Sequence, residues 1–185
     1  MRIGNTHPLR QLFSDLVWRR FYEDVQLCDS RLAAYVSDLL VNFTHTDNLF
    51  QVRDARGRRL EDVGEMLIES NPLLEAASFD REREVRKHIG DYTLFITGLF
   101  PESVAGQRRL KHLRLDVFVD YIKAGKESYS VVSSFNQFEY RGEAPLFRQL
   151  SDNFELCVFG LNLVKQDLER LQQDDYNRLR SALES

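Results

Sequence analysis

Apolar residues between Phe147 and Leu171 recur at every seventh position, in two series offset by three residues. The first series is Phe147, Phe154, Leu161 and Leu168, and the second is Leu150, Cys157, Val164 and Leu171. This spacing is typical of a helix that packs lengthwise against another helix. Pro145 stands where the first turn of a helix tolerates a missing N–H. The pattern therefore predicts one long helix that ends near residue 171.

A second segment, residues 107–135, supplies a partner for this helix. Its two seventh-residue series are Leu110, Val117, Ala124, Val131 and Arg114, Tyr121, Ser128, Phe135. If the chain turns back through residues 136–144, Tyr121 faces Leu161, Ala124 faces Cys157 and small residues face large ones. We predict an antiparallel helical hairpin with a crossing angle of about 20° as the spine of the fold.

The remaining periodicity predicts shorter helices over residues 8–27, 31–43, 60–69 and 80–100. The first half of 80–100 is charged and the second half is apolar, so this helix should enter the core partway along. Residues 44–59 lack a helical pattern and are expected to form an irregular or small hairpin insertion. The predicted fold is a single all-α domain, residues 1–185, a bundle of five to six helices.

Composition narrows the class of protein. The chain has 185 residues, of which 43% are hydrophobic and 29% charged, as in an ordinary globular domain. The net charge of -4 makes general nucleic-acid binding unexpected. No apolar run approaches the roughly 20 residues of a membrane helix, and the first residues are too polar for a signal peptide. Cys28 and Cys157 have apolar neighbours, so we expect buried, reduced thiols in a soluble cytoplasmic protein.

Histidine and aspartate residues suggest one chemical site. His112, Asp116 and Asp120 are spaced by four, and His88 and Asp91 are three apart on the neighbouring predicted helix. Helical bundles hold metals with such inward-pointing side chains, and Asp91 with Asp120 could instead form a carboxylate pair for acid–base chemistry. The competing interpretation is a solvated face, because Lys123 and Glu127 continue the same stripe with alternating charge.

Arginine residues gather in the predicted insertion, and their positions suggest an anion site. They are Arg53, Arg56, Arg58 and Arg59. A phosphate group would suit such a cluster. The alternative is an exposed turn with local ion pairs, because Asp54, Glu61 and Asp62 dilute the positive charge.

The chain has no nucleophile elbow, Walker loop, C-x-x-C or H-E-x-x-H sequence. The sequence therefore favours a non-enzymatic binding or scaffolding protein that acts through protein–protein contacts or self-association. Its expected contact surface is the wide aromatic face of the first helix, namely Phe13, Trp18, Phe21 and Tyr22. The alternative is an enzyme with a metal or paired-carboxylate site between the helices predicted at 80–100 and 107–135; the sequence identifies no cofactor.

Overall fold

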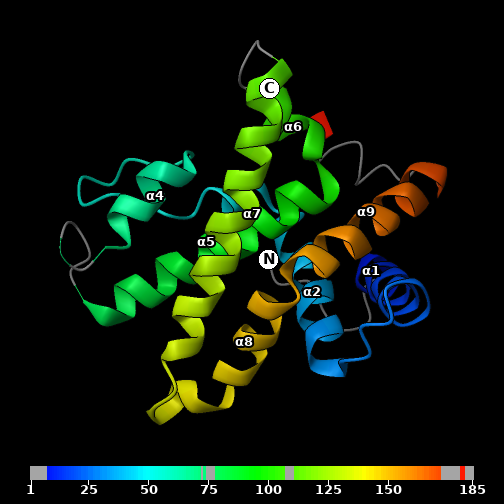
Figure 1. The fold of residues 1–185 in the computed structure, drawn as a ribbon, viewed down its shortest axis with the longest axis horizontal. Coiled ribbons are helices and arrows are strands. Elements are labelled where there is room, and N and C mark those ends of the chain that lie inside the picture. Colours follow the sequence, from blue (N-terminus) through cyan, green and yellow to red (C-terminus); the bar gives the residue numbers. More distant parts are fainter. Residues whose placement is uncertain (1–7, 72, 74–77, 107–110, 172–179, 182–185) are drawn as a thin grey trace.

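The computed structural model describes residues 8–71, 73, 78–106, 111–171 and 180–181 (Figure 1). Within these residues every regular element is a helix, and the only β-type pairing is an isolated bridge between Arg53 and Arg59. The predicted all-α class is therefore confirmed. The α-helices of the described part are α1 (Pro8–Arg19), α2 (Ser30–Phe43), α3 (Thr46–Leu49), α4 (Val63–Glu69), α5 (Phe79–Leu99), α6 (Pro101–Gly106), α7 (Lys111–Ser134), α8 (Ala144–Asp152) and α9 (Phe154–Leu171).

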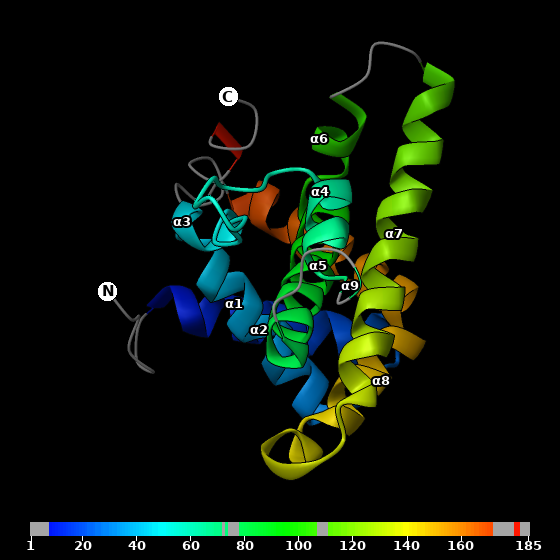
Figure 2. The ribbon, with the colours of Figure 1, turned by 90° about the vertical axis from the view of Figure 1, so that its left-hand side faces the viewer.

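Helix α5 runs through the centre of the molecule, with α7 and α9 packed against it (Figures 1 and 2). It begins at Phe79, where the Ser78 hydroxyl accepts the N–H of Arg81 at 3.1 Å. Every residue from His88 to Leu99 is buried, whereas the first turns carry exposed charges. This helix therefore changes from a solvated to a buried segment, as its sequence predicts.

Helices α5 and α7 cross closely because glycines remove side chains at the crossing. A Cβ on Gly125 of α7 would collide with the Thr93 hydroxyl and the Phe154 ring. A Cβ on Gly90 of α5 would lie 2.5 Å from the Tyr129 ring. Such contacts are far shorter than van der Waals separation, so neither position has room for a larger residue.

The predicted single helix at 145–171 is wrong, because the chain breaks at Asn153 into α8 and α9. Asn153 has φ -110° and ψ 23°, and its side-chain amide donates to the Gln149 carbonyl at 2.9 Å. Helix α8 folds back along α7, but α9 leaves α7 and packs mainly on α5 (Figure 1). Leu161, which the sequence pairs with Tyr121, instead lies against Gly98 of α5.

The N-terminal helices complete the core next to α9. Helix α1 continues into η1 (Arg20–Asp24), a π-helical turn, and α2 begins after Asp29, whose carboxylate accepts the N–H groups of Arg31 and Leu32. Helix α9 crosses η1 where Gly160 meets the Phe21 ring. Asp167 of α9 accepts hydrogen bonds from the guanidinium groups of both Arg19 and Arg20.

The predicted insertion contains α3 and a turn at residues 54–57, closed by the hydrogen bond from Gly57 N–H to the Asp54 carbonyl at 2.9 Å. Gly57 has φ 81°, which favours glycine. The short helix η2 (Phe138–Gly142) connects α7 to α8. Helix α6 begins at Pro101 and was not predicted.

The two cysteines differ in exposure. Cys157 is buried as expected, but Cys28 is exposed, because it lies in the loop before α2 and outside the apolar face of either neighbouring helix. Among the described residues, no helix is both long and apolar enough to cross a membrane.

Candidate functional site

A groove of about 430 Å³ lies between α4 and α7. Its floor is apolar and its rim is charged. The floor residues are Val63, Leu67, Val117, Tyr121 and Ala124. The charged residues are Asp62, Asp120, Glu127 and Lys123. Three carboxylates against one ammonium give the groove a net negative charge, which favours a cationic ligand.

The α7 wall of this groove is part of the seam that the sequence assigns to the long hairpin. Val117, Tyr121 and Ala124 lie on one face of α7 at helical spacing. Because α9 leaves α7 after Asn153, this face is covered only in part, and Val117 and Tyr121 remain half-buried. The break between α8 and α9 therefore leaves room for the groove.

The tyrosines of this region are protonated, and therefore neutral, near pH 7. Burial raises the pKa of Tyr121, and the nearby Asp62 carboxylate raises it further. Burial also raises the pKa of Tyr92, with smaller contributions from Tyr121, Glu61 and Asp62. A neutral Tyr121 ring beside carboxylates can receive the aliphatic stem and positive head of a lysine or arginine.

Asp62 and Asp120 enter the groove in different ways. The Asp62 carboxylate caps α4 by accepting the Glu65 N–H at 3.1 Å. Asp120 is exposed on α7, and no described side chain forms an ion pair with it. Asp120 was expected in a metal or carboxylate site, and the structure places it in this acidic groove.

The other described members of the predicted metal site have structural partners. The Asp91 carboxylate accepts hydrogen bonds from the hydroxyls of Tyr35 at 2.6 Å and Tyr129 at 2.7 Å. It also forms an ion pair with Lys87 at 2.7 Å. The pKa of both tyrosines is raised well above the usual value, mainly by burial and secondly by the charge of Asp91. Asp91 is thus a buried link between α2, α5 and α7.

His88 is also used structurally. Its Nε2 lies 3.1 Å from the Leu49 carbonyl oxygen, which can only accept, so Nε2 carries the proton. Its Nδ1 lies 2.9 Å from the Gln51 side-chain amide. Burial lowers the pKa of His88, so the ring is neutral near pH 7 and joins α5 to the end of α3.

The side chains of His112 and Asp116 lie outside the described residues. Among the side chains that are described, no three of the histidine, cysteine, aspartate and glutamate type converge as metal ligands. Asp91 and Asp120 also differ in setting, because Asp91 is buried and bonded whereas Asp120 is exposed.

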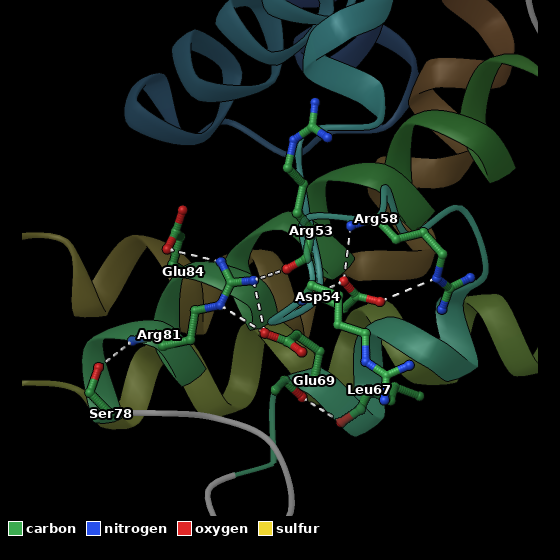
Figure 3. Close-up of polar contacts among 10 residues, drawn as sticks. Arg53, Asp54, Arg58, Leu67, Glu69, Ser78, Arg81 and Glu84 are labelled. Carbon is green, nitrogen blue, oxygen red and sulfur yellow. Dashed lines mark hydrogen bonds and ion pairs between the residues drawn. The ribbon is translucent and has the colours of Figure 1, made fainter.

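The arginine-rich turn already supplies its own anions (Figure 3). Arg58 pairs with Asp54 at 3.2 Å and Glu65 at 3.1 Å, and Arg59 pairs with Asp47 at 3.0 Å. The Arg53 guanidinium donates to the Gly57 carbonyl at 2.8 Å. Arg56 lines a neighbouring cleft of about 450 Å³ with Asp54, Glu65 and Glu69. An added anion would have to compete with these carboxylates.

Arg81 of α5 joins this turn to α4. Its guanidinium donates to the Arg53 carbonyl at 2.5 Å and pairs with Glu69 at 3.0 Å (Figure 3). Glu69 is buried, so this pair is better protected from solvent than those of the turn. Sequence spacing did not identify Arg81, because the Arg53 carbonyl and Glu69 are distant from it along the chain.

The aromatic face of the first helix is divided by the fold. Phe13 and Phe21 are buried in the core. Trp18 and Tyr22 are half-buried and stack on one another with ring centroids 5.0 Å apart. Only Trp18 and Tyr22 thus keep surface that a partner could contact.

Comparison with known proteins adds no relative. No family model, no curated protein and no solved structure matches this chain.

Proposed function

We propose that this protein is a non-enzymatic binding module, and that the groove between α4 and α7 binds a basic, amphipathic segment of a protein partner. The observation that supports this best is the combination of an apolar floor with three rim carboxylates, Asp62, Asp120 and Glu127. Apolar side chains of the partner would bury against Val117 and Leu67, while its lysine or arginine heads would meet the carboxylates.

The charge distribution also predicts that this binding depends on salt concentration. Rim charges at an interface act mainly on the rate of association and on its salt dependence. Because Asp120 and Glu127 are exposed, salt at physiological ionic strength should screen their attraction for charges more than about 8–10 Å away. Binding of a basic segment should therefore weaken as salt is added.

The test uses a fluorescent model peptide in which leucines form one helical face and lysines the other. We expect it to bind the full chain, whereas the same peptide with glutamate in place of lysine should not. Replacing Asp120→Asn together with Glu127→Gln should weaken binding by about tenfold or more at low salt.

The matched control removes two exposed carboxylates elsewhere, Glu23→Gln with Glu139→Gln. This control changes the net charge equally, so it should leave affinity nearly unchanged. Equal loss of affinity in both double variants would mean that only net charge matters and would overturn the proposed site.

We propose self-association through the exposed face of α9 as a second form of protein contact. Leu156 and Phe159 are 44% and 53% exposed, and Leu163 lies on the same outer stripe. Leu156 and Leu163 stand on either side of Phe159, so two antiparallel copies of α9 would place Leu156 of each against Leu163 of the other. Such self-complementarity is what a two-fold interface requires.

A further inference from the structure

A second groove lies at the C-terminal end of α7. It has a volume of about 670 Å³ and is formed where α7, η2 and α8 meet. Its lining residues are Ser130, Ser133, Ser134, Asn136, Arg141, Ala144, Pro145 and Arg148. None of them is a carboxylate, in contrast to the acidic groove between α4 and α7.

Several hydrogen-bond donors in this groove are unused within the described part of the chain. The guanidinium of Arg141, the hydroxyl of Ser130 and the amide of Asn136 have no partner among the described residues. Arg148 uses its Nε to reach Asp152 at 3.2 Å, which leaves its two terminal nitrogens available. The groove is therefore rich in donors and poor in acceptors.

The other two serines differ in this respect. Ser133 donates its hydroxyl to the Ser130 carbonyl at 2.7 Å, and Ser134 donates to the Val131 carbonyl at 2.6 Å. Each of these hydroxyls would have to break that bond before it could donate to a ligand. The arginines, Ser130 and Asn136 are thus the groups ready to bind an anion.

We infer that this groove binds a phosphate monoester, with Arg141 and Arg148 as the two guanidinium contacts. Guanidinium groups form paired, charge-assisted hydrogen bonds with phosphate oxygens, which a lysine cannot reproduce. The arginines of residues 53–59 suit this role less, because Arg58 and Arg59 already use terminal guanidinium nitrogens to pair with carboxylates, whereas Arg148 uses only its Nε. The inference concerns a different surface from the acidic groove and does not depend on the function proposed for it.

The groove has room for more than a phosphate group. A volume of about 670 Å³ is within the range of roughly 300–1,000 Å³ that ligand pockets occupy. Ala144 and Pro145 give part of the lining an apolar surface, against which the rest of the ligand can lie. The carrier is either a small metabolite or a phosphorylated side chain of a protein.

Ligands are titrated into the full chain, and binding is measured by isothermal titration calorimetry and by changes in backbone amide chemical shifts. The probes are inorganic phosphate, free phosphoserine, and a short phosphoserine peptide with its unphosphorylated form. We expect phosphoserine to bind and the unphosphorylated peptide not to bind. Tighter binding of the phosphopeptide than of phosphoserine assigns the site to a protein ligand, whereas equal affinity assigns it to a small phosphate ester.

Variants then locate the site. Arg141→Ala with Arg148→Ala should weaken phosphoserine binding by about tenfold or more, and Arg141→Lys with Arg148→Lys should restore only part of it. Arg56→Ala with Arg170→Ala removes two exposed arginines elsewhere and should leave binding unchanged. All three variants change exposed side chains, and circular dichroism checks that they fold.

Two outcomes would overturn the inference. One is the absence of phosphate-dependent binding in the wild-type chain. The other is an equal loss of affinity in the Arg56/Arg170 control, which would show that the protein attracts phosphate only through its overall charge.

Discussion

At the scale of single residues, polar groups that the sequence offers for chemistry are used to hold helices together. Asp91 accepts from Tyr35, Tyr129 and Lys87, so its oxygens are committed to protein donors. Asp167 plays the same part between α9 and the first helix, through Arg19 and Arg20. In Asp167, the hydrogen bonds from Arg20 and Arg19 favour the charged form of the carboxylate.

Asp167 gives a prediction for the pH dependence of stability. Hydrogen bonds from Arg20, and next from Arg19, lower its pKa, although burial acts in the opposite direction. A lowered pKa means that the unfolded chain takes up the proton first, so this contribution is present at neutral pH and is lost as pH falls below about 4. Asp167→Asn should therefore cost about 2 kcal/mol near neutral pH and progressively less in acid.

Urea unfolding of both proteins at a series of pH values measures this difference. Asp152→Asn is the control, because the Arg148–Asp152 pair is exposed along one helix and should contribute less than about 0.5 kcal/mol. A difference between wild type and Asp167→Asn that stays constant down to pH 2 would contradict the argument.

At the scale of elements, close helix crossings decide which helices become partners. Gly125 lets α7 approach Thr93 of α5 and also admits the Phe154 ring, with which α9 begins. Gly98 admits Leu161 in the same way. The seventh-residue pattern correctly indicates that one face of α9 is buried, but it does not specify whether α7 or α5 covers that face.

Gly125→Ala tests the importance of this crossing. The added methyl group would collide with Thr93 and Phe154, so we expect a loss of about 1–3 kcal/mol in unfolding free energy. Gly142→Ala is the control, since nothing lies within 4 Å of its Cβ position. It should be neutral or slightly stabilising because alanine lowers the entropy of the unfolded chain. Similar losses in both variants would mean that packing at Gly125 is not responsible.

At the scale of the whole molecule, the two grooves carry opposite charge. The acidic groove lies beside α4, and the arginine-lined groove lies where α7 meets α8. A net charge of -4 conceals this separation, because it sums over the entire chain. The two surfaces can therefore recognise ligands of opposite charge, which composition alone would not indicate.

Self-association through α9 belongs to this scale too. We expect light scattering to give a mass above that of the monomer at concentrations of tens of micromolar or higher, with a dependence on concentration. Leu156→Glu with Phe159→Glu should give a monomer at every concentration, since charges would face each other across the two-fold axis. Val119→Glu places a charge at an exposed apolar position of α7 and should leave the mass unchanged. A monomeric wild-type protein would exclude this interface.

The amino-acid sequence by itself determined the helical class, most helix positions and the gradual burial of α5. These properties depend on local spacing, which is visible in a single chain. It also placed Asp120 among the candidate residues, although for a different chemistry.

Only the tertiary structure decided the partners of each buried face. The predicted long helix breaks at Asn153. The break turns α9 away from α7 and leaves Val117 and Tyr121 beside α4. The same long-range packing buried Phe13 and Phe21, which the sequence assigned to a contact surface. Periodicity records that a face is apolar, but the choice among apolar faces depends on the shapes that meet in three dimensions.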